Sequence, residues 1–189
     1  MAILATLVAS VILGQDRSFP VGKVNLSGAT EVTGDPFKLQ EPAGPCSVLI
    51  FLSHDCPIAN RYAPEIKRIY NEYIEKKIPF YRVYLGSAEH YADTAVKHGN
   101  DYGLEFPIVL DPNKKLVEAL NISVTPEVAV ISKDYKLLYR GRIDDQNIEH
   151  GRVKEGYRRD LRVALDEILA GKPVSERATA AVGCFIPRD

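Results

Sequence analysis

The sequence predicts an α/β domain in three layers, a mixed central β-sheet flanked by helices. The run "SVLIFLS" at 47–53 is apolar over a strand's length, which is typical of a strand buried on both faces. Strand-like and helix-like segments then alternate as far as residue 120. Finally, "PEVAVIS" and "YKLLYRGRI" are joined by a Lys133–Asp134 turn, which predicts an antiparallel hairpin at the end of the sheet.

The first helix is predicted over residues 57–77. Apolar residues recur there at three- and four-residue steps, with charged residues between them. Pro57 suits the first turn of a helix, where its missing N–H would have no partner in any case. Pro64 lies inside the same helix, and we expect it to kink the axis.

The remaining elements follow from the same two periodicities. "FYRVYLG" and "FPIVL" predict a second and a third strand, and residues 89–101 a helix that ends near Gly103. "DPNKKLVEAL" predicts a turn and a short helix. Residues 157–170 predict the last helix, which Gly171 and Pro173 end. Short strands such as "VGKVNLS" are expected before residue 47.

Length and charge restrict the function. The chain has 189 residues, 46% of them apolar, and a formal net charge of −1. This indicates one domain at 15–170 followed by a tail at 171–189, and it argues against nucleic-acid binding driven by overall charge. We also expect no membrane span, because no run approaches 18 apolar residues.

Residues 1–14, "MAILATLVASVILG", form the longest apolar run. Its length and its small residues fit a possible secretory signal segment, although no Lys or Arg precedes it. Export to the periplasm or the exterior is the favoured interpretation. A terminal strand or helix packed on a cytoplasmic domain remains the alternative.

Cys56 lies where the strand at 47–53 gives way to the helix at 57–77. The first N–H groups of a helix have no partners within it and carry the positive end of its dipole, so a thiolate there is stabilised. We therefore expect Cys56 to be an exposed, partly ionised nucleophile. The alternative is an inert buried cysteine.

The residues around Cys56 resemble the thioredoxin-like superfamily. In that superfamily the nucleophilic cysteine caps the first helix and a proline follows eight residues later, as Pro64 does here. "SVTPEVAVIS" is similar to the segment with a cis-proline facing the thiol, which implies that role for Pro126, with Thr125 before it. "FPIVLDPNKKLVEALNISVTPEVAVI" resembles the redoxin, or AhpC/TSA (TlpA-like), branch, and the likeness covers about residues 45–170.

The resemblance extends to the C-terminus. "FLSHDCPIANRYAPE", "YRGRIDDQ" and "AVGCFIP" look like a group of bacterial redoxin-domain proteins with a single Cys-Pro active site and a C-terminal Gly-Cys. Ala59 stands where thioredoxins have their second cysteine, so the resolving thiol must come from elsewhere. The tail is long enough to return across the molecule, which predicts a Cys56–Cys184 disulfide in the oxidised state. A Cys46–Cys184 staple, a free Cys184 or an intermolecular bond are the alternatives.

Three functions remain open. The first is a thiol–disulfide oxidoreductase that acts on protein disulfides and is restored by an external thiol reductant. The second is a peroxiredoxin-like peroxidase with antioxidant activity, for which Ser53 matches part of the family motif and Arg142 is a candidate arginine. The third, less favoured, is a copper-binding module. We expect no cofactor and no metal site, and we expect His90 and His98 to be surface residues.

Overall fold

A computed structural model describes residues 19–149 and 152–187. Residues 1–14, on which the export prediction rests, lie outside this range. The strands are β1 (Cys46–Phe51), β2 (Phe80–Tyr84), β3 (Ile108–Leu110), β4 (Val124–Thr125), β5 (Glu127–Ser132), β6 (Leu137–Gly141), β7 (Asn147–Glu149), β8 (Arg152–Val153) and β9 (Cys184–Phe185). The helices are α1 (Pro57–Ile74), α2 (Ala88–Tyr102), α3 (Lys115–Leu120) and α4 (Asp160–Leu169). The five strands of the central sheet and the four helices of the described ranges follow the predicted order, and the short strands β4, β7, β8 and β9 were not predicted.

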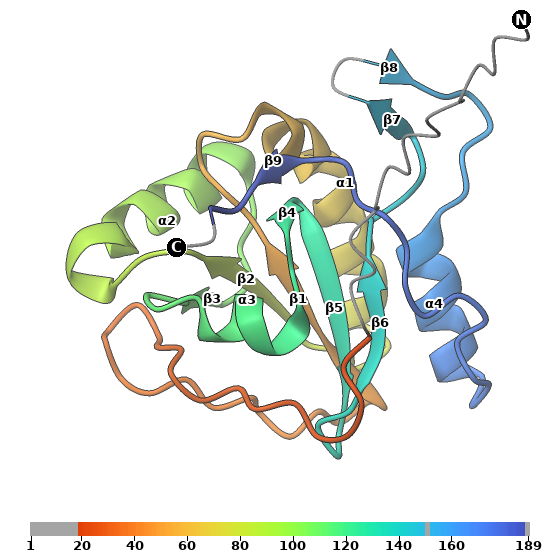
Figure 1. Ribbon diagram of the computed structural model, residues 1–189, viewed down its shortest axis with the longest axis horizontal. Helices are drawn as coiled ribbons and strands as arrows, with labels where there is room; N and C mark the ends of the chain where they lie inside the picture. Colours follow the sequence, from red (N-terminus) through yellow and green to blue (C-terminus); the bar gives the residue numbers. More distant parts are fainter. Residues whose placement is uncertain (1–18, 150–151, 188–189) are drawn as a thin grey trace, which may run out of the picture.

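The central sheet has the order β3-β2-β1-β5-β6 (Figure 1). Strands β1, β2 and β3 run parallel, whereas β5 and β6 form the predicted antiparallel hairpin. All six residues of β1 are buried because helices or other chain segments cover both faces of the sheet. The mixed sheet confirms the predicted fold class.

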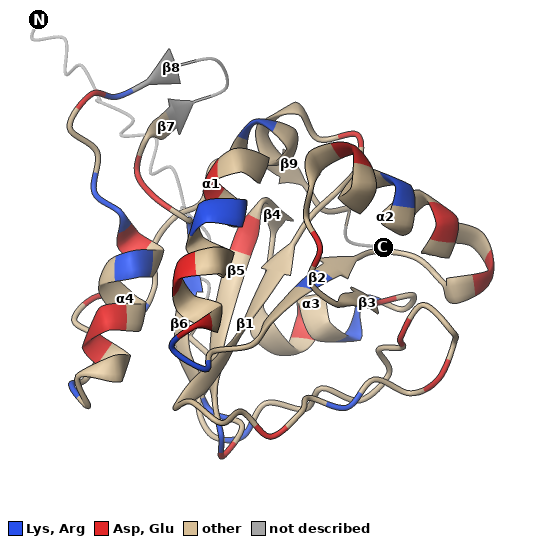
Figure 2. Ribbon diagram, turned by 180° about the vertical axis from the view of Figure 1, so that it is seen from behind, with Lys and Arg blue, Asp and Glu red and all other residues tan. Residues whose placement is uncertain are grey.

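Two clusters of buried apolar side chains hold the covering segments to the two faces of the sheet. On one face, α1, α2 and α4 pack on alternate strand residues such as Val48 and Ile50 (Figure 2). On the other face, α3 and the stretch from 19 to 45 pack on the intervening residues Leu49 and Phe51. This alternation is the two-residue period of a strand covered on both sides.

The stretch before β1 differs from its prediction. The expected strand in "VGKVNLS" is reduced to a single bridge between Lys23 and Lys136. Val24 and Leu26 still bury their side chains against the sheet. Gly22 and Gly28, at the two ends of this segment, adopt positive φ angles of 89° and 94°. These angles turn the backbone out of the extended conformation that a continuous strand needs.

Candidate active site

Cys56 is the N-cap residue of α1, at the carboxyl end of β1. Its backbone is extended, with φ −82° and ψ 110°, and Pro57 takes the first helical position. The Sγ atom accepts a hydrogen bond from the Ala59 N–H at 3.4 Å. The thiol therefore lies on one of the helix N–H groups that have no partner inside the helix, as an anion-stabilising position requires.

A proline turn faces the sulfur from the other side. The Thr125–Pro126 peptide bond is cis, and the Cys56 thiol donates to the Thr125 carbonyl oxygen at 3.0 Å. Cys56 and Thr125 are far apart in the chain, and it is the pairing of β1 with β5 that brings them together. Thr125 and Pro126 thus lie where the sequence resemblance implies.

Glu127 supports this turn, and the sequence analysis missed it. Its side chain is fully buried and its Oε2 accepts the backbone N–H groups of Ser123 at 2.8 Å and Val124 at 3.3 Å. The carboxylate also lies 3.9 Å from the guanidinium of buried Arg140. The available signal was one acid in the otherwise apolar run "PEVAVI", since a buried charge needs partners.

The tail brings Cys184 to the same place. Strand β9 pairs antiparallel with β4, and Cys184 lies directly opposite Thr125. Cys184 packs against the core cluster that contains Cys56, and a hydrogen bond between the two thiols affects the pKa of both. Cys46 lies at the other end of β1, opposite Ser132. All three cysteines are free thiols in this structure.

Gly183 makes this approach possible. A Cβ atom at this position would lie 2.3 Å from the carbonyl oxygen of Thr125 and 3.2 Å from the nitrogen of Pro126. Both atoms belong to the backbone and cannot move aside as a flexible side chain could. Only a residue without a Cβ lets the tail lie so close to the cis-proline turn.

The expected exposure of Cys56 is wrong. The residue is only 1% exposed, whereas Cys184 is half-buried. The prediction failed because it considered the helix end alone, without β4 and β9 around it. The proline turn and the Cys184 thiol nonetheless contact the sulfur, so Cys56 is buried beside polar partners.

These partners decide the ionisation of the pair. Burial acts to raise the pKa of Cys56, but hydrogen bonds from Cys184 and from the Ala59 N–H oppose it, and the net pKa is lowered. Burial and the neighbouring Cys56 raise the pKa of Cys184 to about 11. Cys56 therefore loses its proton before Cys184 does, and the Cys184 thiol still donates a hydrogen bond to the Cys56 thiolate.

A family model described as "AhpC/TSA family" matches residues 21–140. This range contains α1, the cis-proline turn and Cys56, and it covers more than half of the chain. The chain belongs to the AhpC/TSA family. The predicted redoxin resemblance is confirmed.

Relatives and solved structures agree with this assignment. The thiol-disulfide oxidoreductase ResA of Halalkalibacterium halodurans is 26% identical over 63% of this chain and 67% of its own length. A crystal structure of an uncharacterized conserved protein from Geobacillus kaustophilus is 28% identical, with a TM-score of 0.75 over 91% of this chain and 94% of that one. A thioredoxin-like protein from Aeropyrum pernix shares the fold, with 21% identity and a TM-score of 0.50 over 60% of this chain and 80% of that one.

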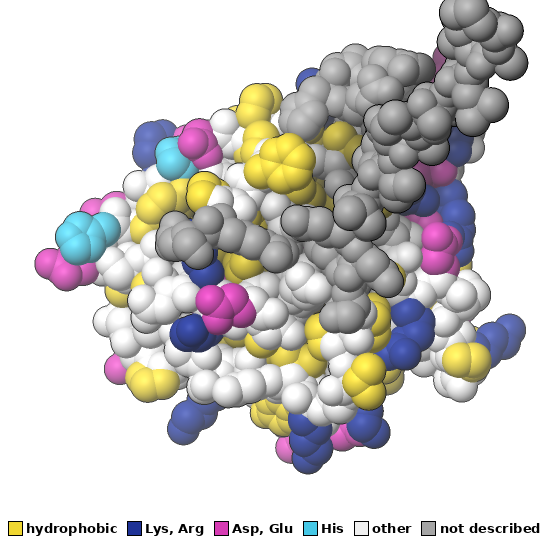
Figure 3. Space-filling model, viewed as in Figure 1, with side chains coloured by type: hydrophobic (Ala, Val, Ile, Leu, Met, Phe, Trp, Pro, Cys, Tyr) yellow, Lys and Arg dark blue, Asp and Glu magenta, His cyan; other side chains and the backbone are white. Residues whose placement is uncertain are grey.

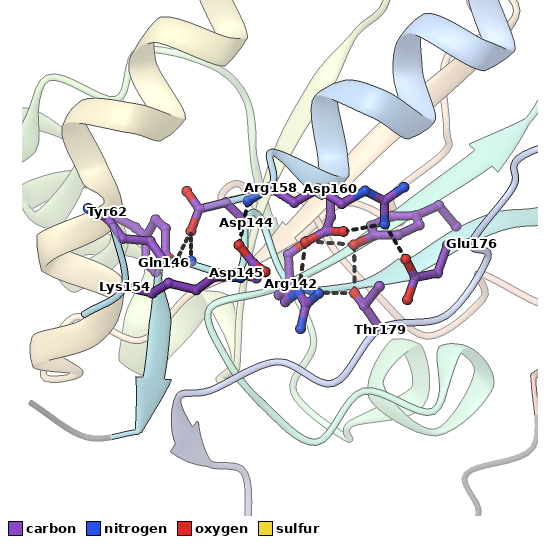
Figure 4. Close-up of polar contacts among 11 residues, drawn as sticks. Tyr62, Arg142, Asp144, Asp145, Gln146, Lys154, Arg158, Asp160, Glu176 and Thr179 are labelled. Atoms are coloured by element: carbon purple, nitrogen blue, oxygen red, sulfur yellow. Dashed lines mark hydrogen bonds and ion pairs between the residues drawn. The ribbon is translucent and has the colours of Figure 1, made fainter. Parts of the chain in front are cut away.

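Two further residues that the AhpC/TSA motif suggested lie in polar contacts of their own. Ser53 donates a short hydrogen bond to Asp55, in the turn before Cys56. Arg142 donates from Nε to Asp160 at 2.7 Å, at the start of α4 (Figure 4). The guanidinium is therefore paired with a buried carboxylate, and its role as a peroxidase arginine remains a prediction.

The expectation that His98 lies on the surface is wrong. Its side chain is only 4% exposed. Its ring nitrogens bond Tyr84 at 2.6 Å and Asn60 at 2.8 Å, and Asn60 donates to the His54 carbonyl at 3.0 Å. Burial lowers the pKa of His98, which favours the neutral ring. This chain of contacts ties the turn before Cys56 to α2.

Proposed function

We propose that this AhpC/TSA-family protein is a thiol–disulfide oxidoreductase, with Cys56 as the nucleophile and Cys184 as the resolving thiol. The observation that carries the proposal is the placement of both thiols at the cis-proline turn: Cys56 donates to the Thr125 carbonyl at 3.0 Å, and Cys184 lies directly opposite Thr125 in the β4–β9 pair. The activity in the name of the ResA relative supports it. Two residues support the nucleophile: Pro57 starts the helix at Cys56, and the Thr125 carbonyl accepts the thiol hydrogen bond.

The reaction follows from the ionisation of the pair. The Cys56 thiolate attacks one sulfur of a substrate disulfide, and the other leaves as a thiolate. Cys184 loses its proton to that leaving group or to solvent and attacks the Cys56 sulfur. A Cys56–Cys184 disulfide forms and the second substrate thiolate departs. An external thiol reductant then returns two electrons and two protons to the pair, so no cofactor enters the cycle.

A peroxidase is the second candidate, because the same dithiol can also resolve an oxidised sulfur. Cys56 thiolate would displace an alcohol or water from a peroxide and become a sulfenic acid, which Cys184 would convert to the disulfide with loss of water. The AhpC/TSA match favours this reading. The pairing of Arg142 with Asp160 speaks against it, since that arginine is directed to α4.

One measurement separates the two activities. Reduced protein is mixed with hydrogen peroxide or with insulin, and the loss of free thiol is followed for the native chain, Cys56→Ser and Cys46→Ser. Disulfide exchange that needs Cys56 and is faster than peroxide consumption supports the oxidoreductase. Fast Cys56-dependent peroxide consumption without exchange transfers the assignment to the peroxidase. Mass mapping that links Cys46 to Cys184 would contradict the resolving role.

Two other expectations remain proposals. Export would place the pair where disulfides persist, with an external thiol as reductant. None of the helices in the described ranges could cross a bilayer, given their length and polarity.

A copper module would need a ligand cluster, and within residues 19–149 and 152–187 no group of three His, Cys, Asp or Glu residues is placed to hold a metal.

A further inference from the structure

The C-terminal tail is attached to the domain at two separate places. After α4 it returns along the edge strand β6 and then reaches β4 (Figure 1). The first attachment is at Thr179 and the second comprises residues 183–186. Between them, Ala180 and Val182 border an open cavity of about 330 Å³. The connecting residues therefore have space to move on one side.

The attachment at Thr179 is made by many polar contacts. Arg140 donates its N–H to the Arg177 carbonyl at 2.9 Å, and its own carbonyl accepts the Thr179 N–H at 3.1 Å. The Thr179 hydroxyl bonds the Tyr139 hydroxyl at 2.7 Å and accepts the Arg142 N–H at 3.0 Å (Figure 4). A parallel bridge between Arg140 and Ala178 thus places the tail alongside β6.

The surroundings strengthen this first attachment. Thr179 is 7% exposed, and a Cβ on Gly141 would lie 2.5 Å from the Thr179 carbonyl oxygen, so the two backbones lie close together. Arg158 joins Asp160 of α4 to Glu176 of the tail (Figure 4). The tail up to Thr179 is thus part of the folded domain.

The attachment at 183–186 is much lighter. It includes the two-residue β4–β9 pairing, the Ile186 N–H bond to Ser123 at 2.9 Å and the burial of the Ile186 side chain. Cys184 also packs against the core cluster, and next to the segment Lys114 Nζ donates to the Pro187 carbonyl at 2.8 Å. Phe185 between them is 83% exposed. Figure 3 shows hydrophobic side chains on the surface in the region of β9. Few contacts would have to break for this segment to leave.

Strand β9 occupies the approach to Cys56. It pairs with Val124 and Thr125, the backbone beside the sulfur, and Cys56 is 1% exposed beneath it. An extended polypeptide that carries a disulfide would need that backbone edge to bring its sulfur to Cys56. We propose that residues 183–186 are a releasable plug that competes with an extended substrate segment for the β4 edge, hinged after Thr179. This inference rests on the proposed function.

The hinge keeps Cys184 within reach after release. Cys184 lies five residues from Thr179 but fifteen from Leu169, the end of α4. Effective concentration falls roughly as the −3/2 power of tether length, so anchoring at Thr179 raises that of Cys184 about fivefold over a tail free from α4 onward. Substrate entry and rapid resolution are then compatible in one chain.

The experiment measures access to Cys56 with reagents of two sizes. Every protein carries Cys184→Ser and Cys46→Ser, so that Cys56 is the one remaining thiol of the three in the sequence. Iodoacetamide and a maleimide on a long polyethylene glycol chain are reacted with the parent and three variants. Gly183→Ala places a Cβ against Thr125, and Ile186→Ala removes the apolar anchor. Val21→Ala is the control, because that side chain is 98% exposed.

The expected result is a rise of about tenfold or more in the bulky-to-small rate ratio for Gly183→Ala and Ile186→Ala, with Val21→Ala unchanged. An unchanged ratio in folded Ile186→Ala overturns the plug, whether or not Gly183→Ala folds. The readout is alkylation, not turnover. If the variants release the plug but the native protein exchanges no disulfide, the proposed function is contradicted and the plug is not.

Discussion

Cys46 and Cys56 lie at opposite ends of one stretch of chain, at the start of β1 and just beyond its end. They are almost equally buried, at 0% and 1% exposure. Yet burial raises the pKa of Cys46 to about 12, while the pKa of Cys56 is lowered. The comparison shows that burial alone does not decide whether a cysteine in this fold is reactive.

The difference is in the donors that each sulfur meets. Cys46 is paired in the sheet with Ser132, and desolvation is the cause of its shift. Burial also acts to raise the pKa of Cys56, but that sulfur meets the Ala59 N–H and the Cys184 thiol, and the net pKa is lowered. A helix N-terminus and a second thiol therefore convert a buried cysteine into a candidate nucleophile.

Replacing each of these two cysteines gives the largest expected effect. Cys56→Ser should reduce disulfide exchange by about a thousandfold or more, because the hydroxyl is a far weaker nucleophile at neutral pH. Cys46→Ser should change the rate less than about twofold, since that sulfur lies at the other end of β1. Exchange with insulin measures both. Equal losses in two folded variants would break the comparison.

Two substitutions of Cys184 isolate its hydrogen bond. Cys184→Ser keeps a donor beside Cys56, whereas Cys184→Ala removes it. Hydrogen bonds to charged groups contribute about 1.5–3 kcal/mol, so the Cys56 pKa should be about one to two units higher in Cys184→Ala than in Cys184→Ser. Thiolate ultraviolet absorbance across a pH titration reports it. Identical titrations would mean that the Cys184 side chain does not stabilise the thiolate.

The two cysteines should also give opposite slopes of stability with pH. The unfolded Cys46 thiol ionises near 9.0 and the folded one near 12, so its contribution favours unfolding as pH rises through that window, by about 1.4 kcal/mol at pH 10. Cys56, with a lowered folded pKa, stabilises above its unfolded pKa, and that contribution is lost as pH falls through the folded value.

Denaturant unfolding of the native chain and Cys46→Ala between neutral pH and pH 10 checks the first slope. The alanine variant is expected to be less stable at neutral pH because of the cavity, but to lose less stability on the alkaline side. If the free energies of unfolding of the native chain and of Cys46→Ala change in parallel with pH, Cys46 is not desolvated in the folded protein.

The smallest expected effect concerns the hinge. Thr179→Val removes the hydroxyl that bonds Tyr139 and Arg142 and keeps the side-chain shape. Closure of the Cys56–Cys184 disulfide from a mixed disulfide should slow about two- to fivefold, as the tether lengthens. Thr30→Val is the matched control, because the buried Thr30 hydroxyl oxygen makes no hydrogen bond in the described structure. Stopped-flow release of the second thiol measures the rate, and matching rates in the two variants would remove the hinge role.

Much of the fold could be read from local patterns. The apolar run of β1, the three- and four-residue steps of α1 and the hairpin after Pro126 each carry their signal within a few residues. The strand predicted before β1 was wrong, because the apolar residues there pack singly against the sheet and do not pair in a ladder. His98 misled for a similar reason, since its partners Tyr84 and Asn60 come from β2 and α1.

The sequence by itself determined the helix end that holds Cys56, because the strand, the cap and Pro57 are contiguous and local geometry follows from local residues. Only the tertiary structure decided that the sulfur is covered, that Glu127 holds the proline turn and that the tail is fixed at Thr179. Those features depend on contacts between segments that are distant in the sequence, such as Arg142 and Thr179, or on a buried carboxylate finding its donors. Such contacts are set by packing of the whole chain, which no short pattern encodes.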